Sequence, residues 1–263
     1  MKRLLRTLAA GAALSAVAAA PAAASHSWNN YHWARTANPF TLQVGDNVLG
    51  DWDTHLRTAN GDWSASAVMD TPTVPGTSNR RCSMTAGTAQ VCNAKYGNNG
   101  WLGLASINLS GSHIMQASAK MNDTYFAGAT YNNPNEKLHV MCQEIGHTFG
   151  LGHTSEDGSS QNTCMDYFSN TGTAATSTTS THPNQHDYDQ LAAIYSHTDS
   201  MSTLASSPAT SAGMAGRSDA RAYRTQRTDR GNHSEIMEHF SDGTTRITDV
   251  LWADGPRPTV DRG

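Results

Sequence analysis

Residues 142–153, with the sequence CQEIGHTFGLGH, constrain the fold more than any other stretch of the chain. From residue 138 to residue 149 there is no proline and only one glycine, and the apolar residues recur as on a half-buried helix. On such a helix Gln143 and His147 share a face, because residues four apart are neighbours there. Glu144 lies on the adjacent strip. The stretch therefore predicts a helix that presents an amide and an imidazole side by side.

A sharp turn is expected directly after this helix. Gly150 tolerates a positive φ, so the chain can reverse there and bring His153 back toward His147. The two imidazoles and the Gln143 amide would then surround one ion and leave one coordination position open. This is the pattern of catalytic zinc sites, in which the ion acidifies a water molecule and a neighbouring carboxylate, here Glu144, takes the proton.

Residues 142–153 resemble HExxHxxGxxH, the zinc signature of the metzincin metalloproteases, with Gln143 in place of the first histidine. Residues 164–167 (CMDY) match a second metzincin feature, a methionine in a tight turn beneath the zinc. The astacin and serralysin branches also have a tyrosine two residues after that methionine. Residues 183–195 resemble the last catalytic-domain helix of the matrixins. Over residues 28–200 the chain is thus similar to the metzincins, closest to the matrixin-like secreted bacterial proteases.

The resemblance implies an α+β fold. We expect a metzincin-like domain with a twisted mixed β-sheet, an active-site helix, a methionine turn at Met165 and a C-terminal helix, followed by a small β-hairpin tail. Gly150 and Met165 would be structural residues of the site. One strand of the sheet should be an edge along which an extended peptide can pair, although the sequence does not identify which strand.

The resemblance also implies a secreted zinc endopeptidase. Zn²⁺ would be held by His147 and His153, with the amide oxygen of Gln143 as a weaker third ligand. Glu144 would act as general base on the water that attacks a peptide carbonyl. Tyr167 would stabilise the oxyanion, by analogy with the branches that carry this tyrosine.

Residues 1–24 have the composition of a secretory signal peptide. They begin with Lys2, Arg3 and Arg6, continue with an alanine- and leucine-rich run, and end in Ala22-Ala23-Ala24. We expect cleavage near Ala24 and export of the mature protein to the extracellular space. The apolar run is too short for a membrane anchor, and no later segment approaches transmembrane length.

The charge of the remaining chain is acidic. The whole chain has 18 Lys and Arg against 22 Asp and Glu, and residues 1–24 hold three basic side chains and no acidic one, which leaves 15 against 22, or −7. This balance argues against nucleic acid or a membrane surface as partner. A protein or peptide substrate is the expected partner, and the protein is expected to be a monomer.

The four cysteines fit an oxidising compartment and allow three pairings. We favour Cys82–Cys92, which closes a short loop, and Cys142–Cys164, which would tie the helix to the turn at Met165. A thiolate metal ligand is the rival interpretation of Cys142. Its position about 100° around the helix from Gln143 makes that role unfavourable.

Alternation and helical periodicity predict the other elements. The expected strands cover residues 40–45, 65–69, 101–109 and 113–121, the last two joined as a hairpin through residues 110–112. An amphipathic helix is expected over residues 46–59. Residues 171–181 are rich in Ser, Thr, Gly and Ala and are expected to form a loop.

The C-terminal part divides in two. Residues 201–233 are polar and without hydrophobic period, so we interpret them as a flexible linker between the catalytic domain (25–200) and an appendage. Residues 234–253 are expected to form a β-hairpin with a glycine turn. A lone hairpin is marginal in water, so it would pack on the catalytic domain or serve as an interaction element.

Other possible ligands are weaker. Residues 122–126 and 132–135 carry oxygens that a structural Ca²⁺ could use, but a solvated loop is the simpler interpretation because the spacing matches no known calcium loop. His139 lies about 12 Å from His147 along the helix axis, which favours a role beside the site rather than in it. No ligand spacing singles out any of the remaining histidines, His26, His32, His55, His113, His182, His186, His197, His233 and His239.

Two other functions remain open at this stage. One is a catalytically impaired secreted binding protein that kept the fold but lost tight metal binding when glutamine replaced histidine. The other is a structural metal protein with a closed fourth position. Glu144 speaks against the second, since a closed structural site does not need a carboxylate there.

Overall fold

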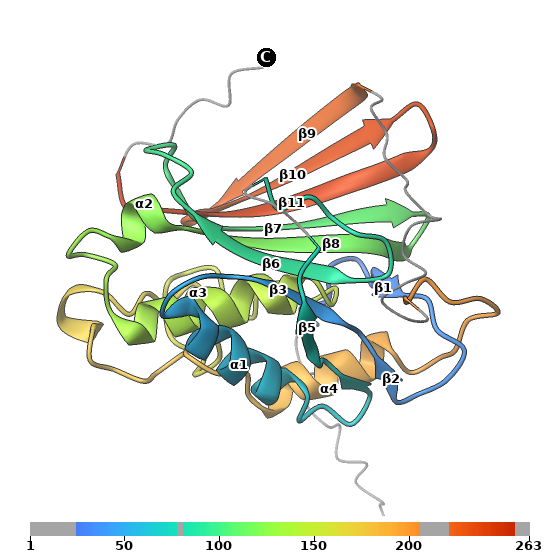
Figure 1. Cartoon of the computed structure of the whole chain (residues 1–263), viewed down its shortest axis with the longest axis horizontal. Coiled ribbons are helices and arrows are strands. Elements are labelled where there is room, and N and C mark those ends of the chain that lie inside the picture. Colours follow the sequence, from blue (N-terminus) through green and yellow to red (C-terminus); the bar gives the residue numbers. More distant parts are fainter. Residues whose placement is uncertain (1–24, 78–80, 206–220, 256–263) are drawn as a thin grey trace, which may run out of the picture.

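The computed structural model describes residues 25–77, 81–205 and 221–255, and the expected signal peptide (1–24) lies outside them. The fold is α+β, with a mixed sheet and four α-helices among these residues (Figure 1). The strands are β1 His32–Trp33, β2 Phe40–Thr41, β3 Val44–Asn47, β4 Met69–Asp70, β5 Thr73–Pro75, β6 Ala89–Ala94, β7 Trp101–Ser110, β8 His113–Asn122, β9 Ala222–Arg230, β10 His233–Phe240 and β11 Thr244–Trp252. The helices are α1 Trp52–Trp63, α2 Asp123–Phe126, α3 Pro134–His147 and α4 Gln185–Ile194, with a short 3₁₀ turn at Gly172–Ala174.

Nine of the strands form one sheet. Its order is β5-β3-β6-β8-β7-β11-β10-β9, and β1 pairs with the start of β8. Strands β5, β3, β6 and β8 are parallel, whereas every pair from β8–β7 to β10–β9 is antiparallel. Figure 1 shows α1, α3 and α4 together on one side of the sheet. The main core lies between these helices and strands β3 to β8.

The predicted hairpin of residues 101–121 is confirmed as β7 and β8. The two strands pair antiparallel from Ser110 opposite His113 to Gly103 opposite Met121. Ile107, Leu109 and Ile114 are fully or almost fully buried. The predicted helices around residues 138–149 and 183–195 are also present, as α3 and α4.

Three expectations in the first half are wrong. The expected strand 40–45 is two short strands, because β2 pairs with β4 while β3 pairs with β5 and β6. The expected helix 46–59 starts only at Trp52, since residues 46 and 47 still belong to β3 and pair with β6. Residues 65–68 turn instead of forming a strand, and the Ser64 hydroxyl accepts the backbone N–H of Thr71 across that turn.

The expected linker 201–233 is also corrected in its last part. Residues 222–230 form β9, which pairs with β10 along its length. Most of its side chains are exposed, so the strand carries no hydrophobic alternation and is held by backbone pairing. Hydrophobic periodicity in the sequence therefore cannot reveal a polar edge strand of this kind.

The expected hairpin 234–253 is confirmed as β10 and β11, and it packs on the rest of the sheet through β7. Strand β11 pairs with β7 from Thr244 opposite Ser110 to Trp252 opposite Trp101. Without β9, β10 and β11, strand β7 would be an edge of the sheet. We call these three strands the C-terminal sheet, and they extend the main sheet on its β7 side (Figure 1).

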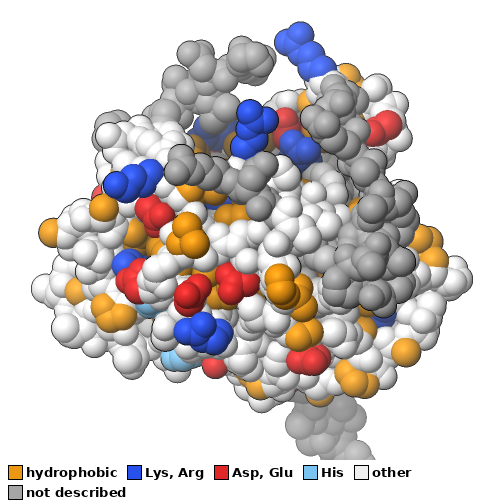
Figure 2. All heavy atoms as spheres, in the orientation of Figure 1, with side chains coloured by type: hydrophobic (Ala, Val, Ile, Leu, Met, Phe, Trp, Pro, Cys, Tyr) orange, Lys and Arg blue, Asp and Glu red, His pale blue; other side chains and the backbone are white. Residues whose placement is uncertain are grey.

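The surface gives no sign of a charged interface on the face shown in Figure 2. Lys and Arg side chains are scattered there among acidic, polar and apolar ones. Among the described residues, no helix combines the length and apolar character needed to cross a membrane.

Candidate metal centre

Helix α3 carries the centre and has clear start signals. The Asn133 side chain accepts the backbone N–H of Glu136 at 2.9 Å, and Pro134 occupies the first helical position, where its missing N–H costs nothing. Val140, Met141 and Ile145 are fully buried in the core. The helix is thus fixed at its start and along one face, which positions the side chains at its C-terminal end.

The turn after α3 occurs where the sequence predicts it. Gly150 has φ +90°, and a Cβ on it would stand 1.9 Å from the carbonyl oxygen of Tyr31, so only glycine fits. The reversal brings the His153 ring to 4.5 Å from the His147 ring, between centroids. Gly150 therefore has the structural role expected of it.

Three side chains converge beyond the end of α3. His147, His153 and Asp249 each offer one ligand atom, and these atoms all lie within 4.8 Å of one another. His147 Nε2 is 3.7 Å from Asp249 Oδ1. The Nε2 atoms of His147 and His153 are both buried and lack a hydrogen-bond partner. This group could hold a metal ion.

The state of the two rings suits coordination. His147 Nδ1 lies 2.9 Å from the Leu151 carbonyl, so this nitrogen carries the proton and Nε2 keeps its lone pair. Burial lowers the pKa of His147 and lowers that of His153 well below its ordinary value, which keeps the rings neutral. Neutral imidazole is the form that binds a metal.

Gln143 lies on the same face of α3, one turn before His147. It is fully buried, and its Nε2 donates to the Asp166 carbonyl at 2.8 Å. That carbonyl can only accept, so the amide orientation is fixed and Oε1 is left buried without a partner. An amide oxygen in this state is available as a ligand, as the sequence suggests.

Glu144 is buried with both carboxylate oxygens unpartnered. It lies against β7, where a Cβ on Gly103 would stand 2.1 Å from Oε1. Burial, and then the charge of Asp249, raise the pKa of Glu144 well above its ordinary value. The carboxylate is therefore a stronger proton acceptor than an exposed glutamate.

The unpartnered atoms together test whether a metal fits. A buried polar atom without a partner costs about 1–3 kcal/mol, and the side chains of Gln143, Glu144, His147 and His153 all carry at least one. Two imidazole nitrogens and an amide oxygen form a donor set that suits a divalent metal. A metal with its water would satisfy groups that otherwise remain costly.

Met165 and Tyr167 lie where the turn passes α3. Met165 is fully buried, packs against Gly146, and its carbonyl accepts the backbone N–H of Thr154 at 2.8 Å. The Tyr167 ring contacts His153 at 4.4 Å and stacks on His233 at 4.1 Å, between centroids. Burial raises the pKa of Tyr167, so its hydroxyl stays protonated and can donate a hydrogen bond.

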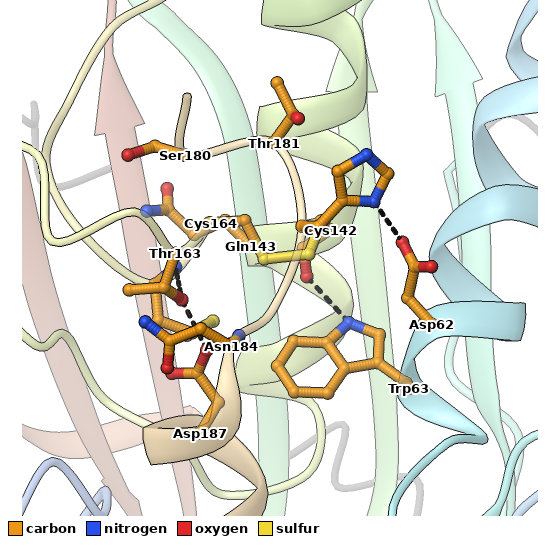
Figure 3. Close-up of a disulfide and its surroundings, with 12 residues drawn as sticks. Asp62, Trp63, Cys142, Gln143, Thr163, Cys164, Ser180, Thr181, Asn184 and Asp187 are labelled. Carbon is orange, nitrogen blue, oxygen red and sulfur yellow. Dashed lines mark hydrogen bonds and ion pairs between the residues drawn. A yellow bond between two sulfur atoms is a disulfide. The ribbon is translucent and has the colours of Figure 1, made fainter. Parts of the chain in front are cut away.

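Both expected disulfides, Cys82–Cys92 and Cys142–Cys164, are confirmed. Figure 3 shows the second one joining α3 to the segment that leads into Met165. Trp63 of α1 donates its indole N–H to the Cys142 carbonyl at 3.1 Å, in the same view. The disulfide therefore fixes the end of α3 that carries Gln143, and it excludes Cys142 as a thiolate ligand.

Sequence reasoning missed the contribution of the C-terminal sheet. Asp249 lies on β11 opposite Ala105 of β7, and its Oδ1 is 2.7 Å from Nδ1 of His233 on β10. A small pocket is lined by His153, Glu156 and Tyr167 on one side and by Arg230, His233 and Asp249 on the other. The expectation that the hairpin packs on the domain was the one hint that it contributes to the centre. Nothing in the sequence links residue 249 to residue 147.

The other candidate ligands from the sequence are His139 and the oxygens considered for Ca²⁺. His139 is buried, and burial lowers its pKa to about 4. It is absent from the metal-competent His and Asp groups found among the described residues. The oxygens considered for Ca²⁺ are used within the chain: Asn122 and Asn133 cap helices, and Asp123 accepts hydrogen bonds from Trp52 and Asn93.

Comparison with known proteins assigns no family. No protein-family model matches the chain, and no curated protein matches it significantly. What the centre can do must follow from its own side chains.

Proposed function

We propose that the chain is a secreted zinc-dependent endopeptidase whose C-terminal sheet holds the site closed. The observation that carries the proposal is the set of buried, unpartnered atoms on Gln143, Glu144, His147 and His153 at the end of α3. Two neutral imidazoles beside a strongly basic carboxylate have a clear use in metal-assisted hydrolysis. The metzincin resemblance of the same residues supports this interpretation.

Zinc is the metal we propose. Nε2 of His147 and His153 would hold it, with Gln143 Oε1 as the weaker third donor. Bound zinc supplies a Lewis acid that lowers the pKa of a water molecule and polarises a peptide carbonyl. The neutral Gln143 amide does not reduce the charge of the ion, so the site would lose affinity rather than reactivity.

The remaining chemistry falls to this chain's own side chains. Glu144 takes the proton of the attacking water and passes it to the leaving amine, a role that its raised pKa favours. Tyr167 remains protonated and would donate to the oxyanion once its ring leaves His233. The Leu151 carbonyl keeps His147 in the tautomer that binds metal.

The C-terminal sheet occupies the place where a substrate would pair. Strand β11 takes up the outer edge of β7, the strand against which Glu144 lies. Asp249 stands on β11 beside His147 Nε2 and would fill the open position of the ion. Trp28 donates to Glu235 at 2.6 Å, and the Ala253 N–H donates to the Gly100 carbonyl at 2.7 Å, so the sheet is held at several points. Cleavage of a substrate then requires release of this sheet.

Secretion and partners complete the proposal. Two disulfides fit an oxidising compartment, in agreement with the signal peptide expected at residues 1–24. An extended segment of protein or peptide would be the substrate, paired on β7. We propose a monomer that binds neither nucleic acid nor membrane.

Asp249 also favours a second candidate function. His147, His153 and Asp249 with Gln143 make a complete ligand set, so the ion could be structural and the protein a secreted binding protein. The two candidates differ in what happens when the C-terminal sheet leaves. A latent peptidase would gain activity when the sheet leaves. A structural site would lose the Asp249 ligand, and the protein would gain no activity.

The deciding experiment places a cleavage site for a specific protease within residues 206–220 of the full chain. The chain folds intact, is loaded with zinc and is then cut, and hydrolysis of a mixed quenched peptide library is followed with and without chelator. We expect chelator-sensitive activity that appears only after the cut. A matched chain with Glu144→Gln controls for contaminating protease. Loss of zinc on cutting, with no activity in any zinc concentration, would favour the structural site instead.

A further inference from the structure

A second cluster of ligand-type side chains lies away from α3. His32 is on β1, His113 is the first residue of β8, and His197 and Asp199 follow α4. The parallel pairing of β1 with β8 places His32 directly opposite His113. Three segments that are remote in sequence therefore meet at one point, which is why ligand spacing could not reveal them.

The nitrogen atoms of this cluster converge on one carboxylate oxygen. Asp199 Oδ1 is 3.2 Å from His113 Nε2, 3.6 Å from His32 Nε2 and 3.6 Å from His197 Nε2. His32 Nε2 and His197 Nε2 are 3.2 Å apart. Ligand atoms around tetrahedral zinc lie about 3.3 Å from one another, given a metal–ligand distance of about 2.0 Å. The separations of 3.2 Å and 3.6 Å among His32, His197 and Asp199 are close to those of a ligand shell.

The tautomer of His32 supports coordination. Its Nδ1 is 2.8 Å from the Asn30 carbonyl and so carries the proton, which leaves a lone pair on Nε2. His197 Nε2 faces this lone pair, and a cation between the two nitrogens would use both of them.

The carboxylate is held in place from behind. Arg35 Nη1 donates to Asp199 Oδ2 at 2.9 Å, and the Arg35 backbone N–H donates to the same oxygen at 3.2 Å. The Arg35 side chain is itself buried against the ring of Tyr195. Oδ2 is thus occupied, and Oδ1 is presented to the imidazoles. Such a hydrogen bond behind a ligating oxygen is usual in metal sites.

We infer that His32, His197 and Asp199 form a second site for a divalent transition metal of the zinc class, with His113 beside it as a partner of Asp199 Oδ1. The side chains of His113 and His197 are 29% and 49% exposed, so an ion can enter from solvent.

Such an ion would fasten the first strand of the mature chain to the rest of the domain. His32 is followed by Trp33, whose indole N–H donates to the Thr148 carbonyl at the end of α3 at 2.9 Å. The ion would therefore link β1 to the segment after α4, close to the turn that carries His153. We expect it to stabilise the fold and to leave the ligands of the first centre unchanged.

The test counts metal in the full chain. Protein stripped with chelator is dialysed against zinc, and bound zinc is measured by mass spectrometry of the metal. Two equivalents are expected for the parent. His197→Ala combined with His113→Ala should retain one, and His147→Ala combined with His153→Ala should also retain one. His182→Ala, which removes a half-exposed histidine bonded to Asp62 outside both clusters, should retain two.

A second readout does not depend on stoichiometry. Zinc should raise the midpoint of thermal unfolding in the chain lacking His147 and His153, and this rise should vanish when His113 and His197 are also replaced. The inference is overturned if the parent holds only the equivalent that depends on His147 and His153, or if the His113 and His197 variant still holds two. If the parent holds only one equivalent and that equivalent survives without His147 and His153, this site is supported and the first is contradicted.

Discussion

At the scale of single residues, Glu144 is the side chain whose role is simplest to test. In the chain opened at its C-terminal sheet, Glu144→Gln removes the proton acceptor but keeps the size of the side chain. We expect zinc binding to persist and the rate of peptide hydrolysis to fall about 10²–10⁴-fold, the usual contribution of a general base. Steady-state kinetics with metal analysis measures both. A variant with parental rate would remove Glu144 from the mechanism.

Gln143 is the proposed weaker zinc ligand of the first centre. An imidazole nitrogen is a better zinc donor than an amide oxygen, so Gln143→His should tighten zinc binding about tenfold or more, and Gln143→Ala should weaken it. Isothermal titration of the metal-free chain resolves the two changes, ideally with the His113 and His197 pair replaced so that one site remains. Unchanged affinity in Gln143→Ala would show that the amide is no ligand.

Glu136 makes stability depend on pH. Burial raises its pKa from 4.5 to about 7, against hydrogen bonds from Asn170 and Ser169 that lower it. The folded state thus keeps a proton that the unfolded state releases, and stability falls as pH rises from about 4.5 to about 7. Glu136→Gln should remove this fall and gain about 3 kcal/mol over the parent at pH 8, since one pKa unit is worth about 1.4 kcal/mol. Urea unfolding at pH 5 and pH 8 measures the difference, and parallel pH profiles for the two chains would contradict it.

Single residues also show where sequence reasoning stops. His147, His153 and Gly150 could be placed beforehand because their geometry is local: one helical turn and one reversal. Asp249 and His233 could not, because they reach the centre only through strand pairing nearly 100 residues later in the chain. His32 and His197 were not predicted as ligands for the same reason, because a cluster assembled from separate segments has no ligand spacing in the sequence.

At the scale of elements, the Cys142–Cys164 disulfide should carry much of the stability of α3. It closes a loop with a sequence separation of 22, and the chain-entropy model gives such a loop about 3 kcal/mol. Replacing both cysteines by alanine should lower the free energy of unfolding by about this amount and loosen Gln143, which is adjacent. Chemical denaturation measures the first effect and zinc titration the second. A chain with unchanged stability and affinity would leave the disulfide without a role at the site.

The long, well-buried strands were predictable from the sequence, and the exposed or very short ones were not. Strands β7 and β8 are ten residues long and mostly buried, so their apolar residues stand out in the sequence. Strand β9 is almost wholly exposed, and β3 is only four residues long, so neither leaves a periodic trace. The boundaries of α1 depend on where β3 stops pairing, which is again information from outside the segment.

At the scale of the whole molecule, the proposed second site, the disulfide and the C-terminal sheet would each hold a different part of the fold in place. The proposed second site would fasten β1, the Cys142–Cys164 disulfide fastens α3, and in the proposed function the C-terminal sheet closes the first centre. The salt bridge between Arg230 and Glu156 joins the sheet to the turn near His153, but it is well exposed and contributes at most about 1 kcal/mol. Strand pairing and the contacts of Trp28 and Ala253 must hold the sheet instead.

In the proposed peptidase, the covalent attachment of β11 would limit how well a peptide substrate competes for the edge of β7. A strand tethered to the same chain meets β7 at an effective concentration on the order of millimolar, whereas a free peptide arrives at micromolar levels. A substrate would therefore lose this competition by roughly a thousandfold, whatever its sequence. Inhibition of this kind is unimolecular, so dilution would not relieve it and added substrate would hardly do so. Cutting the tether turns the inhibitor into an ordinary ligand that dilution removes, which makes proteolysis rather than substrate the natural trigger.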